Sequence, residues 1–236
     1  MVDGEARQAA ARRAGPSALT SIGRRSLAVE AYRQIRQALT TGELLPGQKL
    51  NIREIADSFG TSATPVREAL VQLAGEGALE LRAGHSFTVP VLTRSTYLEL
   101  RDLRLNLEGL GAARAAELAS PSAIDKLDGL HAKLVAAKAR KDFKAALRWN
   151  ESFHLALCRE AAMPRLLRIV EGLWAQSGPL LNMLYATSRM PSAEDKVHGH
   201  LRVIEALRRR DAAAARAGIE DDIAGGTGEL LAHLKD

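Results

Sequence analysis

Two histidines, an amide and a carboxylate occupy positions that helical periodicity turns toward the inside of the protein. Asn150 and His154 are four residues apart, so both lie on one helix face together with apolar neighbours. His200 lies on a similar apolar stripe, and Asp222 shares a seam with alanine and isoleucine in the last helical segment. A buried carboxylate is costly unless it is paired, and a cation would supply that partner. For either histidine alone, a hydrogen-bonded core side chain is the commoner explanation.

A second group of polar residues stands at the start of a short helical segment that follows Gly60. This glycine separates two helical patterns and can adopt the positive φ that a tight turn needs. Pro65 suits the first turn of the second helix, and Ser62 or Thr64 can cap its free amides. Because the apolar face turns inward, Arg67 projects outward, where an arginine can pair with guanine in a major groove. The pattern is that of a helix-turn-helix, although Arg67 alone would be equally consistent with a surface salt bridge.

The segment that follows predicts a wing. Short strands are expected over 79–81 and 87–89, around a turn at 83–85, and an earlier helix is expected over 27–41. Together these elements predict a winged helix-turn-helix.

From Arg94 onward the strand signals vanish and helical periodicity takes over. Six helical segments are predicted: 94–119, 121–140, 142–160, 164–188, 193–210 and 211–234. The fold class is therefore mainly α, with an N-terminal winged helix-turn-helix followed by an all-α helical bundle. The domains are a flexible arm over 1–25, a winged helix-turn-helix DNA-binding domain over 26–92, and an all-helical domain over 94–234.

Composition sets wider limits. A chain of 236 residues that is 46% apolar can form the cores of two modest domains. The net charge of +5 suits a nucleic-acid partner only weakly, because residues 1–92 carry +2 and the remainder +3. The single cysteine, Cys158, forms no internal disulfide, and no apolar run reaches the roughly 20 residues of a membrane span. A cytoplasmic location is expected.

Two stretches carry a family resemblance. TPVREAL followed by LAGEGALELRAGHSFTVP resembles the winged helix-turn-helix of the GntR superfamily of bacterial transcription regulators. NESFHLAL followed by HGHLRVIEAL resembles the FCD domain of its FadR-type branch. The resemblance covers roughly residues 26 to 234 and implies a sequence-specific DNA-binding transcription regulator, not an enzyme. It also implies that residues 94–234 form an effector-binding and dimerisation domain.

The resemblance also implies which residues contact DNA. The matching positions are Arg53, Ser62, Thr64, Arg67, Gly84 and His85. One departure concerns Ala63, where the family commonly has a second arginine before the Thr-Pro pair. The operator is therefore expected to differ from the family's usual short palindrome, or Arg53 and Arg67 to contribute more of the recognition.

For the metal site the family usually supplies one aspartate and three histidines. The matching residues here are Asn150, His154, His200 and Asp222, with an aspartate in place of the last histidine. Mixed nitrogen and oxygen ligands suit Zn, Ni or Mn. Arg104 matches a position that can bind an effector carboxylate, or it forms an intrahelical pair with Glu108.

The resemblance thus predicts a homodimer that binds palindromic double-stranded operator DNA. Repression is the most frequent role in the family, so a repressor is expected. A small anionic metabolite, such as an organic acid, would control it from a cavity that contains a divalent metal. Two alternatives are a metal-sensing regulator, in which the ion itself is the signal, and a metal-dependent hydrolase.

Overall fold

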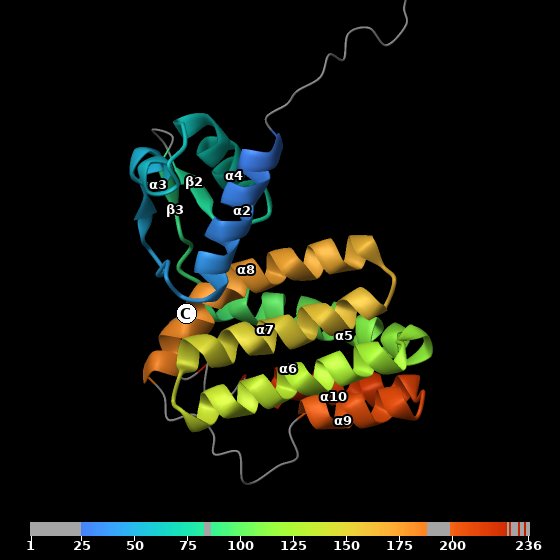
Figure 1. The fold of residues 1–236 in the computed structure, drawn as a ribbon. Coiled ribbons are helices and arrows are strands. Elements are labelled where there is room, and N and C mark those ends of the chain that lie inside the picture. The colour runs from blue at the N-terminus through green and yellow to red at the C-terminus, as the bar shows by residue number, and fades with distance from the viewer. Residues whose placement is uncertain are drawn as a thin grey trace, which may run out of the picture.

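The computed structural model describes residues 25–82, 86–187 and 199–225, together with residues 227, 231 and 234. The predicted arm, apart from Arg25, and the predicted turn at 83–85 lie outside these residues. Figure 1 shows a small N-terminal part, here called the head (25–82 and 86–89), against a larger bundle of helices that begins at Arg94. Within the described part, no helix has the length and apolar character that a membrane crossing requires.

The head contains three described helices and a small sheet. Its elements are α2 (Arg25–Thr40), β1 (Lys49–Leu50), α3 (Ile52–Ser58), α4 (Ala63–Gly75), β2 (Glu80–Arg82) and β3 (Ser86–Thr88). The sheet is antiparallel in the order β1-β3-β2, with Leu81 opposite Phe87 and Lys49 opposite Thr88. The two wing strands were predicted within one residue. Strand β1 was not predicted, because two residues are too few to show an alternating pattern.

Local sequence explains where α3 and α4 begin and how the chain turns between them. Asn51 caps α3, since its side chain accepts a hydrogen bond of 3.0 Å from the Arg53 amide. Gly60 has a φ of +61° in the turn that follows, as the sequence predicted. Ser62 occupies the N-cap position of α4 without a side-chain capping bond, so its hydroxyl is not used by the helix start. The buried side of α4 packs Leu70 and other apolar residues against α2 and α3.

The bundle consists of six helices within the described residues. They are α5 (Arg94–Leu118), α6 (Pro121–Ala139), α7 (Phe143–Glu160), α8 (Pro164–Thr187), α9 (Gly199–Arg208) and α10 (Ala212–Gly225). Side chains of Thr93, Ser120 and Asp142 accept hydrogen bonds from backbone amides at the starts of α5, α6 and α7. The predicted segments agree with these helices except near their ends; α9 is described only from Gly199, and α10 without interruption only as far as Gly225.

Helices α9 and α10 approach each other closely at a glycine. A Cβ added to Gly199 would lie 2.5 Å from the Asp222 Cβ, so only glycine fits there. This contact brings the start of α9, which carries His200, against the part of α10 that carries Asp222. The main core of the bundle, built from α5, α6, α7, α9 and α10, surrounds that point.

Neighbouring residues on α4 allow a test of the head's core. Leu70 is fully buried, whereas the next residue, Val71, is 52% exposed. We expect Leu70→Ala to lower the free energy of unfolding by about 2–5 kcal/mol, because it removes buried methyl groups and leaves a cavity. Val71→Ala should change it by less than about 0.5 kcal/mol. Urea unfolding followed by circular dichroism measures both, and equal losses in the two variants would contradict this packing.

Candidate functional site

The start of α4 is an exposed polar tip. Ser62, Thr64 and Arg67 are all exposed, and so is Arg53 on the neighbouring α3. The other end of α4 is held against the bundle, because the backbone oxygen of its C-cap residue, Glu76, accepts a hydrogen bond from α8. A helix of 13 residues is about 20 Å long, so the tip lies about that far from the contact with Gln176. The tip is therefore open to a large partner such as a DNA groove.

A cluster of ionisable groups is buried in the bundle. His154 on α7 and His200 on α9 are 1% and 0% exposed, and Asp222 on α10 lies beside them. Three of the four residues predicted to bind a metal thus converge from three helices. The fourth, Asn150, lies one turn before His154 on α7 and is partly exposed.

The spacing of the three donor atoms fits a divalent metal. The Nε2 atoms of His154 and His200 are 3.2 Å apart, and the Asp222 Oδ2 atom lies 3.2 Å from the first and 3.6 Å from the second. Ligands of a tetrahedral ion with bonds of about 2.0–2.1 Å would be about 3.3 Å apart. Two imidazole nitrogens and one carboxylate oxygen are also a common donor set for Zn²⁺.

A second carboxylate orients the first histidine. The Nδ1 atom of His154 lies 2.6 Å from Oε2 of Glu108 on α5, which is fully buried. The other oxygen of Glu108 accepts a hydrogen bond of 2.6 Å from Nε of Arg104. The guanidinium carbon of Arg104 lies 3.9 Å from the ring centre of Trp174 on α8. A carboxylate on the remote nitrogen of a histidine fixes its tautomer and is a frequent companion of metal ligation.

This arrangement leaves Nε2 of His154 facing both Nε2 of His200 and an oxygen of Asp222. If Nδ1 donates to Glu108, a neutral imidazole presents the lone pair of Nε2 toward the Asp222 oxygen, where two acceptors would face each other. A metal ion, a second proton on His154, or a proton on Nε2 of His200 donated to His154 removes that conflict. Burial alone would lower the pKa of His154, but the charges of Glu108 and Asp222 outweigh it and raise the pKa above its usual value. Burial would likewise raise the pKa of Glu108, but Arg104 and His154 lower it overall.

The position of Arg104 agrees with the intrahelical pair that the sequence offered as an alternative. It is 8% exposed and bonded to Glu108 one turn along α5. Its place beside the cluster is compatible with effector binding as well, so that role stays a prediction. Gly84 and His85, predicted to contact DNA, lie outside the described residues.

Some groups around the cluster were not singled out from the sequence. His131 on α6 is 6% exposed, and its ring centre lies 5.6 Å from that of His200. It lies on an apolar helical stripe with Ile124, Leu127 and Leu134. His154 was identified as a polar side chain on such a stripe, and the same criterion would have identified His131. The Phe153 ring stacks on His200 at 3.6 Å between centres.

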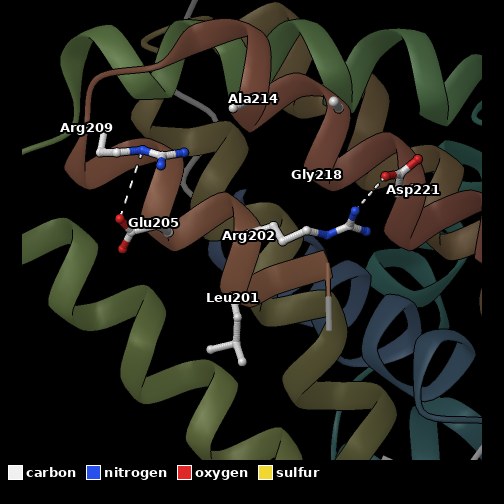
Figure 2. A pocket seen from close by; sticks show the side chains of 8 residues that line it. Leu201, Arg202, Glu205, Arg209, Ala214, Gly218 and Asp221 are labelled. Atoms are coloured by element: carbon white, nitrogen blue, oxygen red, sulfur yellow. Dashed lines mark hydrogen bonds and ion pairs between the residues drawn. The ribbon is translucent and has the colours of Figure 1, made fainter. Parts of the chain in front are cut away.

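The outer faces of α9 and α10 form a different feature, an open groove of about 370 Å³ (Figure 2). Arg202 pairs with Asp221 at 2.8 Å along this groove, and Arg209 lies 4.0 Å from Glu205. These side chains are solvated and carry no buried donor set. The chemistry of the bundle is on the inner faces of the same two helices, where His200 and Asp222 lie.

The fold and its exposed helix tip define a winged helix-turn-helix transcription regulator with a helical C-terminal domain. Residues 27–89 match the family described as "Bacterial regulatory proteins, gntR family", and residues 99–225 match the "FCD domain". The chain belongs to the GntR family of regulators, in the branch that carries an FCD domain.

Relatives support this assignment over most of the chain. The HTH-type transcriptional regulator McbR of Escherichia coli is 30% identical, over 81% of this chain and 86% of that protein. The solved structure of E. coli McbR/YncC covers 87% of this chain and 97% of its own, with a TM-score of 0.80. A probable D-xylose utilization operon transcriptional repressor of Paenarthrobacter nicotinovorans is 30% identical, over 86% and 88% of the two chains. These relatives are transcription regulators, which confirms the expectation that the chain is not an enzyme and sets aside the hydrolase alternative.

The raised pKa of His154 gives a pH-dependent prediction for chelator-treated protein. The charge on His154 contributes its full stability below pH 6.5, the ordinary histidine value, and this contribution is lost as pH rises through the raised pKa. Glu108→Gln should lower the pKa of His154, because it removes the nearest negative charge. An NMR titration of the histidine Cε1 protons measures both values. The interpretation fails if His154 in the metal-free wild type titrates below pH 6.5.

Proposed function

We propose that this regulator is a homodimer that represses transcription from a palindromic operator and responds to a small carboxylate bound beside a metal ion. Residues 26–92 recognise the DNA, and residues 94–234 bind the metal and effector and form the dimer. The observation that carries the proposal is the convergence of His154, His200 and Asp222 within one buried cluster, in a protein whose α4 tip is open.

The DNA surface consists of the α4 tip, its neighbour on α3, and the wing. Thr64 and Arg67 enter the major groove, while Ser62 and Arg53 hold the backbone phosphates. Gly84 and His85 of the wing contact the adjacent backbone. Ala63 is exposed beside these residues and presents only a methyl group, which favours contact with a thymine methyl over a guanine.

The metal is held by His154, His200 and Asp222, with Asn150 as a further oxygen ligand. A divalent ion with one carboxylate ligand keeps a net charge of about +1, because the neighbouring charges of Glu108 and Arg104 cancel. Such a site attracts an anionic effector, and Zn²⁺, Ni²⁺ and Mn²⁺ all suit these ligands. The metal supplies a positive point at which an effector oxygen can bind.

Arg104 takes the effector's carboxylate in this proposal. A guanidinium has five N–H donors, and its Nε donates to Glu108, so the two Nη groups are the ones that receive a carboxylate. Binding then favours one placement of the two heads of the dimer over another. The extent of control is limited by the difference in effector affinity between the two states.

A metal-sensing role is the second candidate, and the burial of the cluster favours it. The two histidines are 1% and 0% exposed, so a single ion enters more easily than an organic acid. A sensor releases its operator when metal alone is added, with reversible affinity. A resident metal instead binds tightly, and only the organic ligand changes DNA binding.

Arg67→Ala tests the DNA surface. We expect it to weaken operator binding by roughly 5- to 150-fold per half-site, because one bidentate contact with a base contributes about 1–3 kcal/mol. Binding to an operator selected from random duplexes, measured at fixed salt, gives the result. Arg202→Ala, which removes a side chain of the groove in Figure 2, is the control. Equal operator affinity in wild type and Arg67→Ala would refute the assignment.

Bound metal tests the cluster. Protein grown with Zn, Ni and Mn available should carry about one ion per chain, and His154→Ala or His200→Ala should lose it. Glu108→Gln should retain the ion with about 10- to 100-fold weaker affinity, because it alters only the partner of His154. Elemental analysis and chelator competition measure content and affinity, and protein free of metal with all ligands intact would overturn the proposal. If metal alone releases the operator, the metal-sensing candidate is correct. If only carboxylates release it, the effector-controlled candidate is correct.

A further inference from the structure

Helix α8 faces the head with one side and the buried cluster with the other. Trp174 packs in the bundle, with its ring centre 5.1 Å from that of His154. The next residue, Ala175, is fully buried within the hydrophobic core of the head. The head is therefore packed onto the bundle through shared core residues as well as joined to it by the chain at 90–93 (Figure 1).

Polar contacts fix the head at two separate places on α8. The side-chain amide of Gln176 donates a hydrogen bond of 2.9 Å to the Glu76 backbone oxygen, at the end of α4. The side-chain amide of Asn182 donates one of 2.8 Å to the Thr40 backbone oxygen, at the end of α2. A Cβ added to Gly178, between them, would lie 2.6 Å from the Thr40 Cα, so the two backbones are as close as a glycine permits.

A third contact comes from α7. Arg36 on α2 pairs with Glu151 at 3.2 Å, and the two side chains are only 18% and 11% exposed. Burial raises the pKa of Glu151, whereas Arg36 and the nearby Thr40 side chain oppose that rise. Glu171 on α8 is a further carboxylate that acts on Glu151. A carboxylate this deeply buried at a contact between two parts of a protein holds its partner in one position, because leaving either charge unpaired is unfavourable.

We propose that Glu151, Gln176 and Asn182 are positioning residues for operator recognition, which set the distance between the two α4 tips of the dimer and so the half-site spacing that the protein accepts. They touch no DNA and act through the orientation of the head. This inference rests on the proposed dimer on a palindrome.

The length of α4 makes that orientation matter. Its tip lies about 20 Å from the Gln176 contact at its other end, so a tilt of about 10° moves the tip by about 3.5 Å. One base-pair step along DNA is about 3.4 Å. In a two-fold symmetric dimer both heads rotate, so a rotation of about 5° in each head changes the distance between the two tips by about 3.5 Å, which is about one base pair.

The test measures binding of full-length protein to duplexes in which two selected half-sites are moved apart one base pair at a time. Wild type should favour one spacing over its neighbours by about 10-fold or more, as for one mismatched position. Glu151→Gln, Gln176→Ala and Arg36→Ala should reduce this preference to less than about 3-fold. Their binding to a duplex with a single half-site should stay unchanged, because the α4 tip is intact.

Two further variants test the mechanism. Gly178→Ala places a methyl group against the Thr40 backbone and should move the preferred spacing by about one base pair rather than remove the preference. Arg36→Lys retains the charge facing Glu151 and should keep the wild-type profile. Arg202→Ala removes an ion pair of similar length, 2.8 Å, from an exposed part of the bundle and should leave the profile unchanged.

Thermal unfolding shows which variants are folded. If the variants of the charged pair do not fold, Gln176→Ala, the mildest change, still tests the inference. A wild-type spacing profile in Gln176→Ala, Glu151→Gln and Gly178→Ala would overturn this inference while leaving the proposed function intact. A wild type that binds single half-sites but shows no spacing preference would instead overturn the dimer on a palindrome, and this inference with it.

Discussion

The contact between Glu108 and His154 organises the inside of the bundle. A fully buried carboxylate is stable only when its charge is met, and here an arginine meets one oxygen and an imidazole the other. Because Glu108 fixes one nitrogen of His154, the other nitrogen points toward His200 and Asp222. Four helices, α5, α7, α9 and α10, must keep their relative positions for this network to persist, and the close approach of Gly199 to Asp222 is one consequence.

The same helices that carry this network also carry the head. On α7, Glu151 lies one turn before His154, and on α8, Gln176 follows Trp174 by two residues. A shift of α7 or α8 at the cluster would therefore reach the head over a single helical turn. No long chain of intermediate residues is required, because one rigid element touches both places.

Much of the fold was predictable because it depends on local sequence. Gly60 and Pro65 specify the turn and the helix start on their own, and the six helical segments of the bundle show clear periodicity. His154, His200 and Asp222 were identified by polar side chains on apolar stripes, and the structure brings them together. The role of Glu108 was missed because Arg104, one turn away, offered a sufficient local explanation for it.

The contacts between head and bundle were beyond sequence reasoning for a different reason. Arg36 and Glu151 are 115 positions apart, and Asn182 and Thr40 are 142 apart. Each of these residues, taken alone, has the appearance of an ordinary polar residue on an amphipathic helix. Only the packing of α2 across α7 and α8 converts them into partners, and periodicity carries no information about which helices cross.

The aspartate at position 222 has a consequence for how the cluster behaves without a metal. A third histidine at this position would supply no negative charge to the cluster. Asp222 does supply one, and it favours a proton on His154. A divalent ion held by His154, His200 and Asp222 would compete with that proton, so its affinity would fall as the solution becomes more acidic. The two carboxylates around His154 thus favour positive charge at this point, whether a proton or a metal ion carries it.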